Sequence, residues 1–367
     1  MTLTVERETR HDRTKLAVID CDIHTAAANS STLAKYMSER WRRHHEIFGG
    51  RGHSGANYPR ANKNAARTDS WPPNGQPPGS DLAFLQHQLL DTWNLEYGVT
   101  TPLLGAGGQL NLEYGAALGT AINEWQIAEW VDLEPRLRGS ILVSNEDGDL
   151  TAAEIDRVGH RPEFVQVLIS IRTAEPLGRR KYWKMFEAAC RHDLPIGIHF
   201  GGSGGFPITG VGFPSFYIED HAGMSTAFQS QITSMIFEGV FERFPTLKIV
   251  LIEGGFAWLP SLMWRLDNTW KKLHDEVPHV KRLPSEYIRE HFWITTQPME
   301  EPPKPAQFLQ LLEHLDMNDR LMFATDYPHW DFDAPDQAIP ARLGAELERN
   351  IMADNAKALY RFSALSR

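Results

Sequence analysis

Near the amino terminus the chain reads Lys15-Leu-Ala-Val-Ile-Asp-Cys-Asp-Ile-His24, and this stretch decides how the fold is interpreted. The apolar run that opens it is typical of a buried strand. Alternate side chains of a strand share one face, so Asp22 and His24 leave the carboxyl end of this strand in the same direction. Oxygen and nitrogen donors aimed at one point indicate the beginning of a metal site.

Apolar runs of strand length recur along the rest of the chain and alternate with amphipathic segments of helix length. This alternation predicts a (β/α)8 TIM barrel of parallel strands rather than an open doubly wound sheet. We expect a single barrel domain over residues 15–367, preceded by an N-terminal extension over residues 1–14. The expected strands are Leu16–Cys21, Tyr97–Pro102, Gly139–Val143, Phe164–Ile169, Pro195–His199, Leu247–Ile252, Phe292–Thr296 and Leu321–Ala324.

One segment between the first two expected strands breaks the alternation. Residues 43–80 are rich in Gly, Pro, Asn and Arg and lack a hydrophobic period. This composition predicts a long insertion after strand one that lies over one mouth of the barrel, with disorder as the alternative.

Composition excludes several classes of partner. The formal charge is −10 and the chain has no block of Lys and Arg, which argues against nucleic acid or an anionic membrane as a partner. A small-molecule substrate fits better. The two cysteines, Cys21 and Cys190, make a disulfide framework implausible and favour the cytoplasm. No apolar run approaches the length of a membrane span.

Polar side chains end three further strands. His199 follows an apolar run at strand five, Glu253 follows strand six and Asp326 follows strand eight. In a (β/α)8 barrel these positions lie at one rim together with Asp22 and His24. Two imidazoles and three carboxylates around one point would be desolvated and unbalanced without a cation, so the sequence predicts a divalent metal ion.

Six motifs carry a resemblance to a known family, which extends from Val18 to about Phe362. The chain resembles the amidohydrolase superfamily, in the amidohydrolase 2 branch related to aminocarboxymuconate semialdehyde decarboxylase. The motifs are Asp20-Cys-Asp-Ile-His24, Leu194-Pro-Ile-Gly-Ile-His199, Gly239-Val-Phe-Glu-Arg-Phe-Pro-Thr-Leu-Lys248, Glu253-Gly-Gly-Phe-Ala-Trp-Leu-Pro260, Thr325-Asp-Tyr-Pro-His-Trp-Asp331 and Asn355-Ala-Lys-Ala-Leu-Tyr360.

The resemblance implies a metal ion held by Asp22, His24, His199 and Asp326. The chain departs from the common superfamily pattern, because it has Asp-x-His where many members have His-x-His and Glu253 where they have a histidine. Strand four ends at Ile169-Ser-Ile-Arg172 and offers no lysine for a bridging carbamate. We therefore expect one ion, with two possible. The ligand types suit Zn, Mn or Fe.

Several residues at this rim have more than one possible role. Glu253 could be a direct metal ligand, a bridge to a second ion, a general base, or an acceptor that orients a ligand imidazole. In the family the strand-eight aspartate also shuttles a proton, which makes Asp326 the first catalytic candidate. His329 could contact substrate, bind a second ion or cap its loop. Asp331 and Asp333 could join a second site or pair with an arginine.

Three residues are predicted to contact the substrate on position alone. His221 precedes a helix after strand five, Gln297 follows strand seven, and Trp330 stands beside Asp326 in the strand-eight loop. An aromatic ring at the last position could wall the pocket.

Three functions remain open. The first, which follows the resemblance most directly, is hydrolysis or decarboxylation of a small carboxylate, amide or lactone. The second is a subunit of an iron or mixed-metal oxygenase that hydroxylates a small amino acid or amine, as in the 2-aminoisobutyrate hydroxylase system. The third is a catalytically silent metal-binding subunit in a hetero-oligomer with a homologous active chain. A homo-oligomer is the alternative assembly.

Overall fold

The computed structural model describes residues 17–29, 31–51, 60–201, 212 and 214–362. Its eight strands form one sheet in the order of the sequence, and each strand pairs in parallel with the next. This confirms the predicted barrel and its eight strands. The strands are β1 Val18–Ile23, β2 Leu95–Thr100, β3 Leu137–Leu142, β4 Phe164–Ser170, β5 Ile196–His199, β6 Ile249–Ile252, β7 Phe292–Thr295 and β8 Leu321–Met322.

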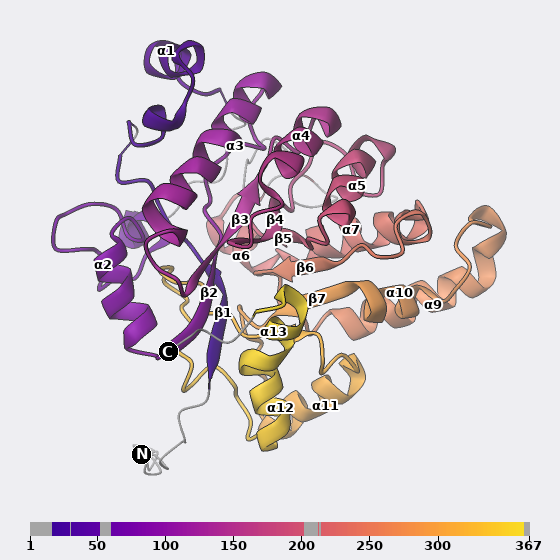
Figure 1. Cartoon of the computed structure of the whole chain (residues 1–367). Helices are drawn as coiled ribbons and strands as arrows, with labels where there is room; N and C mark the ends of the chain where they lie inside the picture. Colours follow the sequence, from indigo (N-terminus) through magenta and orange to yellow (C-terminus); the bar gives the residue numbers. More distant parts are fainter. Residues whose placement is uncertain (1–16, 30, 52–59, 202–211, 213, 363–367) are drawn as a thin grey trace, which may run out of the picture.

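Helices surround the strands (Figure 1). Apolar side chains on the inner faces of these helices pack on the outside of the barrel, as in the fully buried Trp125 and Phe186. No helix among the described residues combines the length and apolarity needed to cross a bilayer. The helices are α1 Glu39–Phe48, α2 Leu82–Leu85, α3 Leu112–Gln126, α4 Gly148–Val158, α5 Trp183–Arg191, α6 Tyr217–Ala222, α7 Ser225–Phe237, α8 Val240–Arg243, α9 Leu259–Leu273, α10 Pro284–His291, α11 Pro305–Leu315, α12 Ala345–Arg349 and α13 Asn355–Tyr360.

The first strand and the segment that follows the last strand close the barrel. The backbone N–H of Cys21 donates to the carbonyl of Phe323 at 3.0 Å, and that of His24 donates to the carbonyl of Tyr327 at 2.7 Å. The fully buried Asp20 accepts hydrogen bonds from the backbone N–H of Thr325 at 2.9 Å and from its hydroxyl at 2.5 Å. These contacts fix the position of the strand-eight loop relative to β1.

Burial raises the pKa of Asp20 to about 7, although the hydrogen bonds from Thr325 oppose this rise. Between about pH 4 and pH 7 the native protein keeps a proton that the unfolded chain releases, so the free energy of unfolding falls as pH rises. The loss in the free energy of unfolding reaches its full value above about pH 7 and amounts to about 4 kcal/mol. Asp20→Asn removes the titrating group. We expect the Tm of this variant, relative to the Tm of the unmodified protein, to increase as the pH is raised from about 5 to 8.

Differential scanning calorimetry with chelator in all samples measures this difference without interference from bound metal. The other titrating groups are common to both proteins and cancel in the comparison. A Tm difference that does not change with pH contradicts the prediction.

The segment 43–80 does not stand apart as the expected long insertion. Residues 43–48 complete α1, so the expected loop is wrong there, and residues 52–59 lie outside the described part of the chain. Ala65 and Arg67 join the strand-eight loop through backbone hydrogen bonds, from Trp330 N–H to Ala65 at 2.7 Å and from Arg67 N–H to Pro328 at 2.9 Å. The segment therefore packs into the rim of the barrel beside the loop that carries Asp326.

Candidate metal centre

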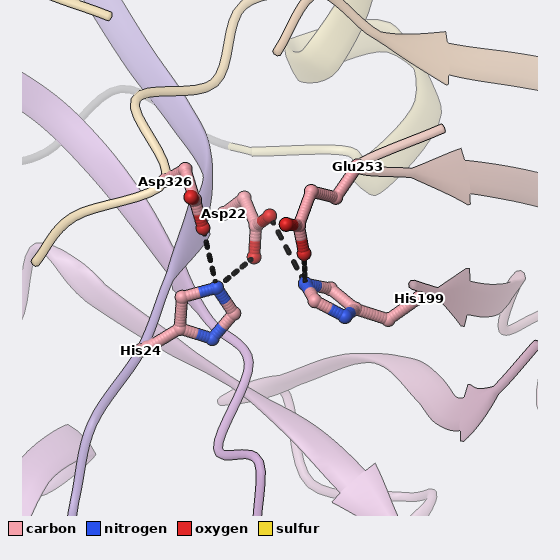
Figure 2. Close-up of side chains that lie close together, drawn as sticks. All are labelled: Asp22, His24, His199, Glu253 and Asp326. Carbon is pink, nitrogen blue, oxygen red and sulfur yellow. Dashed lines mark hydrogen bonds and ion pairs between the residues drawn. The ribbon is translucent and has the colours of Figure 1, made fainter. Parts of the chain in front are cut away.

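Five side chains meet at the rim formed by the carboxyl ends of the strands (Figure 2). Asp22 belongs to β1 and His24 follows it, His199 ends β5, Glu253 follows β6, and Asp326 lies in the loop after β8. All five are buried, and each offers one possible ligand atom within 4.8 Å of those of the others. The structure thus brings together the metal ligands that the sequence predicted.

The two histidines are held in the same way, with Nδ1 on a backbone carbonyl and Nε2 facing carboxylates. His24 Nδ1 donates to the carbonyl of Thr101 at 2.7 Å, and His199 Nδ1 donates to the carbonyl of Phe200. Histidines that bind a metal ion through one ring nitrogen commonly donate a hydrogen bond from the other nitrogen in this manner. With Nδ1 donating in both rings, each Nε2 faces carboxylate oxygens, so a proton or a metal ion must lie between Nε2 and these anions.

The Nε2 atoms lie close to the three carboxylates. His24 Nε2 is 2.7 Å from Asp326 Oδ1 and 3.5 Å from Asp22 Oδ1. His199 Nε2 is 3.2 Å both from Asp22 Oδ2 and from Glu253 Oε2, as the dashed lines of Figure 2 show. Asp22 therefore spans both imidazoles. The donor set of nitrogen and carboxylate oxygen fits Mn(II), Fe(II) or Zn(II).

The electrostatics of the cluster favour a cation. Burial lowers the pKa of His24, but Asp22 and Asp326 outweigh burial and raise that pKa to about 9. Burial, followed by repulsion from Asp326, raises the pKa of Glu253 well above its usual range. The site thus retains protons where no metal ion balances its carboxylates, and a divalent ion would compete with protons for the same place.

The backbone is left-handed at two of the five residues. Glu253 has a φ of 56° and Asp326 has a φ of 61°, in a region of backbone conformation that residues other than glycine rarely occupy. The turn at the end of β6 carries Glu253 into the barrel mouth. Such conformations persist where the surrounding contacts require them, and they gather at functional sites.

His329 lies directly against the cluster. Its Nδ1 donates to Asp326 Oδ1 at 2.7 Å, and its ring centre is 4.3 Å from that of His24. Asp326 therefore contacts two imidazoles with one oxygen. His329 is the third histidine at the site, although the sequence left its role open.

The residues predicted to contact the substrate lie around Asp331 of the strand-eight loop. Gln297 Nε2 donates to Asp326 Oδ2 at 3.4 Å and to Asp331 Oδ2 at 3.2 Å. His221 Nε2 lies 3.1 Å from Asp331 Oδ2, and its ring is 5.3 Å from that of Trp330. Asp333 accepts a hydrogen bond from the backbone of Met299 rather than pairing with arginine.

A cavity of about 570 Å³ opens beside the cluster. His24, His199 and His329 reach its wall, whereas His221, Gln297 and Trp330 are not among the residues that line it. The rest of the wall is mainly apolar and includes Pro77, Pro78, Pro102, Leu103, Leu104, Leu142, Val143, Leu168, Ile169 and Phe200. A mainly apolar cavity with imidazoles at one end is suited to a small organic molecule that carries a polar group.

Contacts made by Thr101 and by Arg172 were not anticipated from the sequence. The Thr101 hydroxyl donates to Asp22, and its carbonyl holds His24. Its place at the end of the second strand was the available signal. Arg172 pairs with Asp220 at 2.6 Å, and both residues are buried in the cavity wall. This pair could not be predicted from the sequence, because Arg172 follows β4 whereas Asp220 belongs to α6, after β5.

The fold and the donor set together define a metal-binding barrel of the amidohydrolase type. The family model described as Amidohydrolase matches residues 19–362. The chain therefore belongs to the amidohydrolase family, as its motifs suggested.

Individual relatives share this organisation at low sequence identity. Gamma-resorcylate decarboxylase from Rhizobium sp. (strain MTP-10005) is 24% identical over 315 residues, which cover 77% of this chain and 91% of that protein. The crystal structure of dihydroxybenzoic acid decarboxylase from Polaromonas sp. JS666, with bound manganese and 2-nitroresorcinol, has a TM-score of 0.68 at 20% identity and covers 94% of this chain and 97% of its own.

A second solved structure gives the same result. The 5-carboxyvanillate decarboxylase from Novosphingobium aromaticivorans DSM 12444, in complex with manganese and 4-hydroxy-3-methoxy-5-nitrobenzoic acid, has a TM-score of 0.69 at 17% identity. The match covers 96% of this chain and 98% of that chain. At these identities the structural likeness establishes the shared fold.

Proposed function

We propose that this protein is a metal-dependent decarboxylase that removes a carboxylate group from a small aromatic acid. One observation carries the proposal: two imidazoles, fixed by backbone carbonyls, turn Nε2 toward three buried carboxylates at the end of an apolar cavity. The relatives reported above are decarboxylases of aromatic acids, and two of them hold manganese in their crystals.

The proposed metal ligands are Asp22, His24, His199, Glu253 and Asp326. A divalent cation bound there would supply the positive charge that attracts an anionic substrate and offsets charge on its oxygen atoms. Manganese is the proposed ion, since the carboxylate-rich donor set and the relatives both favour it. Thr101 would keep Asp22 and His24 in the orientation that binding needs.

His329 is the proposed proton donor, with Asp326 behind it. Loss of the carboxylate as CO2 breaks a carbon–carbon bond and leaves an electron pair on the ring carbon, which takes up one proton. His329 lines the cavity, and its Nδ1–H donates to Asp326, which fixes the orientation of the ring. After transfer the neutral imidazole regains a proton from water.

Residues that line the cavity away from the metal ligands would select the substrate. We propose that the rim segment at 64–80, part of the stretch first expected as an insertion, contributes to this choice through Asn64, Pro77 and Pro78. Contacts to an aromatic ring would come from Phe200 and from the aliphatic wall. His221, Gln297 and Trp330 would act indirectly, through the residues that reach the cavity.

The direct experiment combines metal loading with a substrate assay. Chelator-treated protein, reloaded with Mn2+, is incubated with 2,6-dihydroxybenzoate and with 5-carboxyvanillate, and CO2 release is measured. We expect decarboxylation of at least one aromatic acid, a loss of more than about 10²-fold on metal removal, and recovery on readdition. Hydrolysis of amides or lactones without any decarboxylation contradicts the proposal.

The other functions considered from the sequence have less support. The comparisons do not support a hydroxylase subunit, since the relatives reported are decarboxylases. No feature of the described residues favours a catalytically silent subunit. All five proposed metal ligands are present in one cluster, and the cluster adjoins a cavity.

A further inference from the structure

A second group of possible metal ligands adjoins the first and shares Glu253 with it. His221 of α6 and Asp331 of the strand-eight loop each offer an atom within 4.8 Å of one another and of a Glu253 oxygen. His221 Nε2 is 3.1 Å from Asp331 Oδ2. In Figure 2 one oxygen of Glu253 is joined to His199, while the other is not joined to any residue drawn.

We propose that His221, Glu253 and Asp331 bind a second divalent cation, with Glu253 bridging it to the ion of the first cluster. The proposal rests on the first metal ion of the proposed function, because the two ions share a ligand. A carboxylate bridge is a common arrangement for paired metal ions about 3.5–4 Å apart. This site differs from a carbamate-bridged pair, which needs a lysine where this chain has Arg172.

The balance of charge favours a second cation. Asp22, Glu253, Asp326 and Asp331 are four carboxylates in one region, and one divalent ion would offset half of their charge. Among the described residues, the ion pairs of these four are all with histidines. A buried excess of negative charge is costly unless cations or protons balance it. A second divalent ion would complete the balance.

Gln297 supplies an independent observation. Its side chain is fully buried, and its Nε2 reaches Asp326 Oδ2 of one cluster and Asp331 Oδ2 of the other. The amide oxygen of the same group has no hydrogen-bond partner within the described part of the chain. Buried amide oxygens are normally paired. The amide nitrogen now faces the two acidic clusters, and a half-turn of the amide group would place the unpartnered oxygen there as a neutral ligand of the kind that Mn(II) accepts.

The two positions should differ in affinity. The side chains of His221 and Asp331 are 19% and 15% exposed, whereas those of the first cluster are 7% exposed or less. Because the second ion would have fewer protein ligands and would be more accessible to solvent, it would bind more weakly and exchange more readily than the first ion. Its occupancy would then follow the free metal concentration.

The test counts manganese ions in the full-length protein. Chelator-treated protein is titrated with Mn2+, and bound metal is measured by elemental analysis after equilibrium dialysis. We expect two ions per chain in the unmodified protein at excess Mn2+ and one in His221→Ala or Asp331→Asn. Electron paramagnetic resonance should show exchange coupling between neighbouring ions in the unmodified protein but not in His221→Ala or Asp331→Asn, which excludes a second ion elsewhere on the surface.

The matched control is His192→Asn, which removes a histidine that pairs with Asp156 at 2.9 Å outside the barrel mouth. It should keep two coupled ions. One ion in the unmodified protein overturns this inference and leaves the proposed function standing, whereas no ion overturns both. Two ions in a folded His221→Ala variant also overturn it. If a variant does not fold, the count and coupling in the unmodified protein decide.

Discussion

Replacing Asp326 with asparagine is expected to lower kcat for decarboxylation by on the order of 10³-fold while leaving the fold intact. Asp326 contacts His24 and His329 through one oxygen, each at 2.7 Å. Asparagine keeps the size of the side chain but loses the negative charge that would bind a metal ion and that accepts the hydrogen bond orienting His329. One substitution therefore impairs both parts of the proposed chemistry. Steady-state kinetics with excess Mn2+ measure the effect.

Asp333→Asn is the matched control for this variant. Asp333 belongs to the same loop, but its carboxylate accepts from the backbone of Met299 instead of contacting the cluster. We expect its kcat to remain within about threefold of that of the unmodified protein, since it touches neither substrate nor a proposed ligand. Full activity in a folded Asp326→Asn variant would refute the catalytic assignment.

His199→Ala is expected to raise the Kd for the first Mn2+ by more than about 10²-fold and to abolish decarboxylation. The imidazole comes from β5, across the barrel from the β1 ligands, and its Nε2 lies 3.2 Å from both Asp22 and Glu253. Removal of this imidazole leaves the carboxylates of Asp22 and Glu253 without the nitrogen ligand that contacts both of them. Isothermal titration with Mn2+ measures the affinity, and CO2 release measures the activity.

His291→Ala provides the corresponding control for loss of a buried histidine. His291 is 2% exposed and packs on Phe241, but it precedes β7 and so lies at the opposite end of the barrel. It should lower stability, because a cavity forms and the hydrogen bond to the carbonyl of Leu247 is lost, yet it should leave Mn2+ affinity unchanged. Equal loss of Mn2+ affinity in the two variants would show that general damage, rather than a lost ligand, explains the first.

The positions of the proposed metal ligands were predictable because the barrel imposes them. Eight apolar runs in parallel place every residue that ends a strand at one rim, so Asp22, His24, His199, Glu253 and Asp326 could be grouped before their distances were known. The strand ends lie at most two residues from their expected places, as in β8, which ends at Met322. Such shifts do not change the rim to which a residue belongs.

Contacts between loops were not predictable in this way. The hydrogen bond from His329 to Asp326 and the position of Gln297 between Asp326 and Asp331 depend on how two loops pack. No hydrophobic period encodes that packing. The start of the segment 43–80 was misjudged for a different reason. Residues 43–46 are all polar, and they belong to a helix in which no residue is buried, so no buried apolar stripe marked it as a helix.

The closure of the barrel by β1 and the strand-eight loop has a consequence for biosynthesis. Asp22 and His24 leave the ribosome more than 300 residues before Asp326 does. The hydrogen bonds from Cys21 to Phe323 and from His24 to Tyr327 cannot form earlier. A nascent chain therefore lacks part of the proposed ligand set until Asp326 has emerged, and the metal site can be completed only after that point.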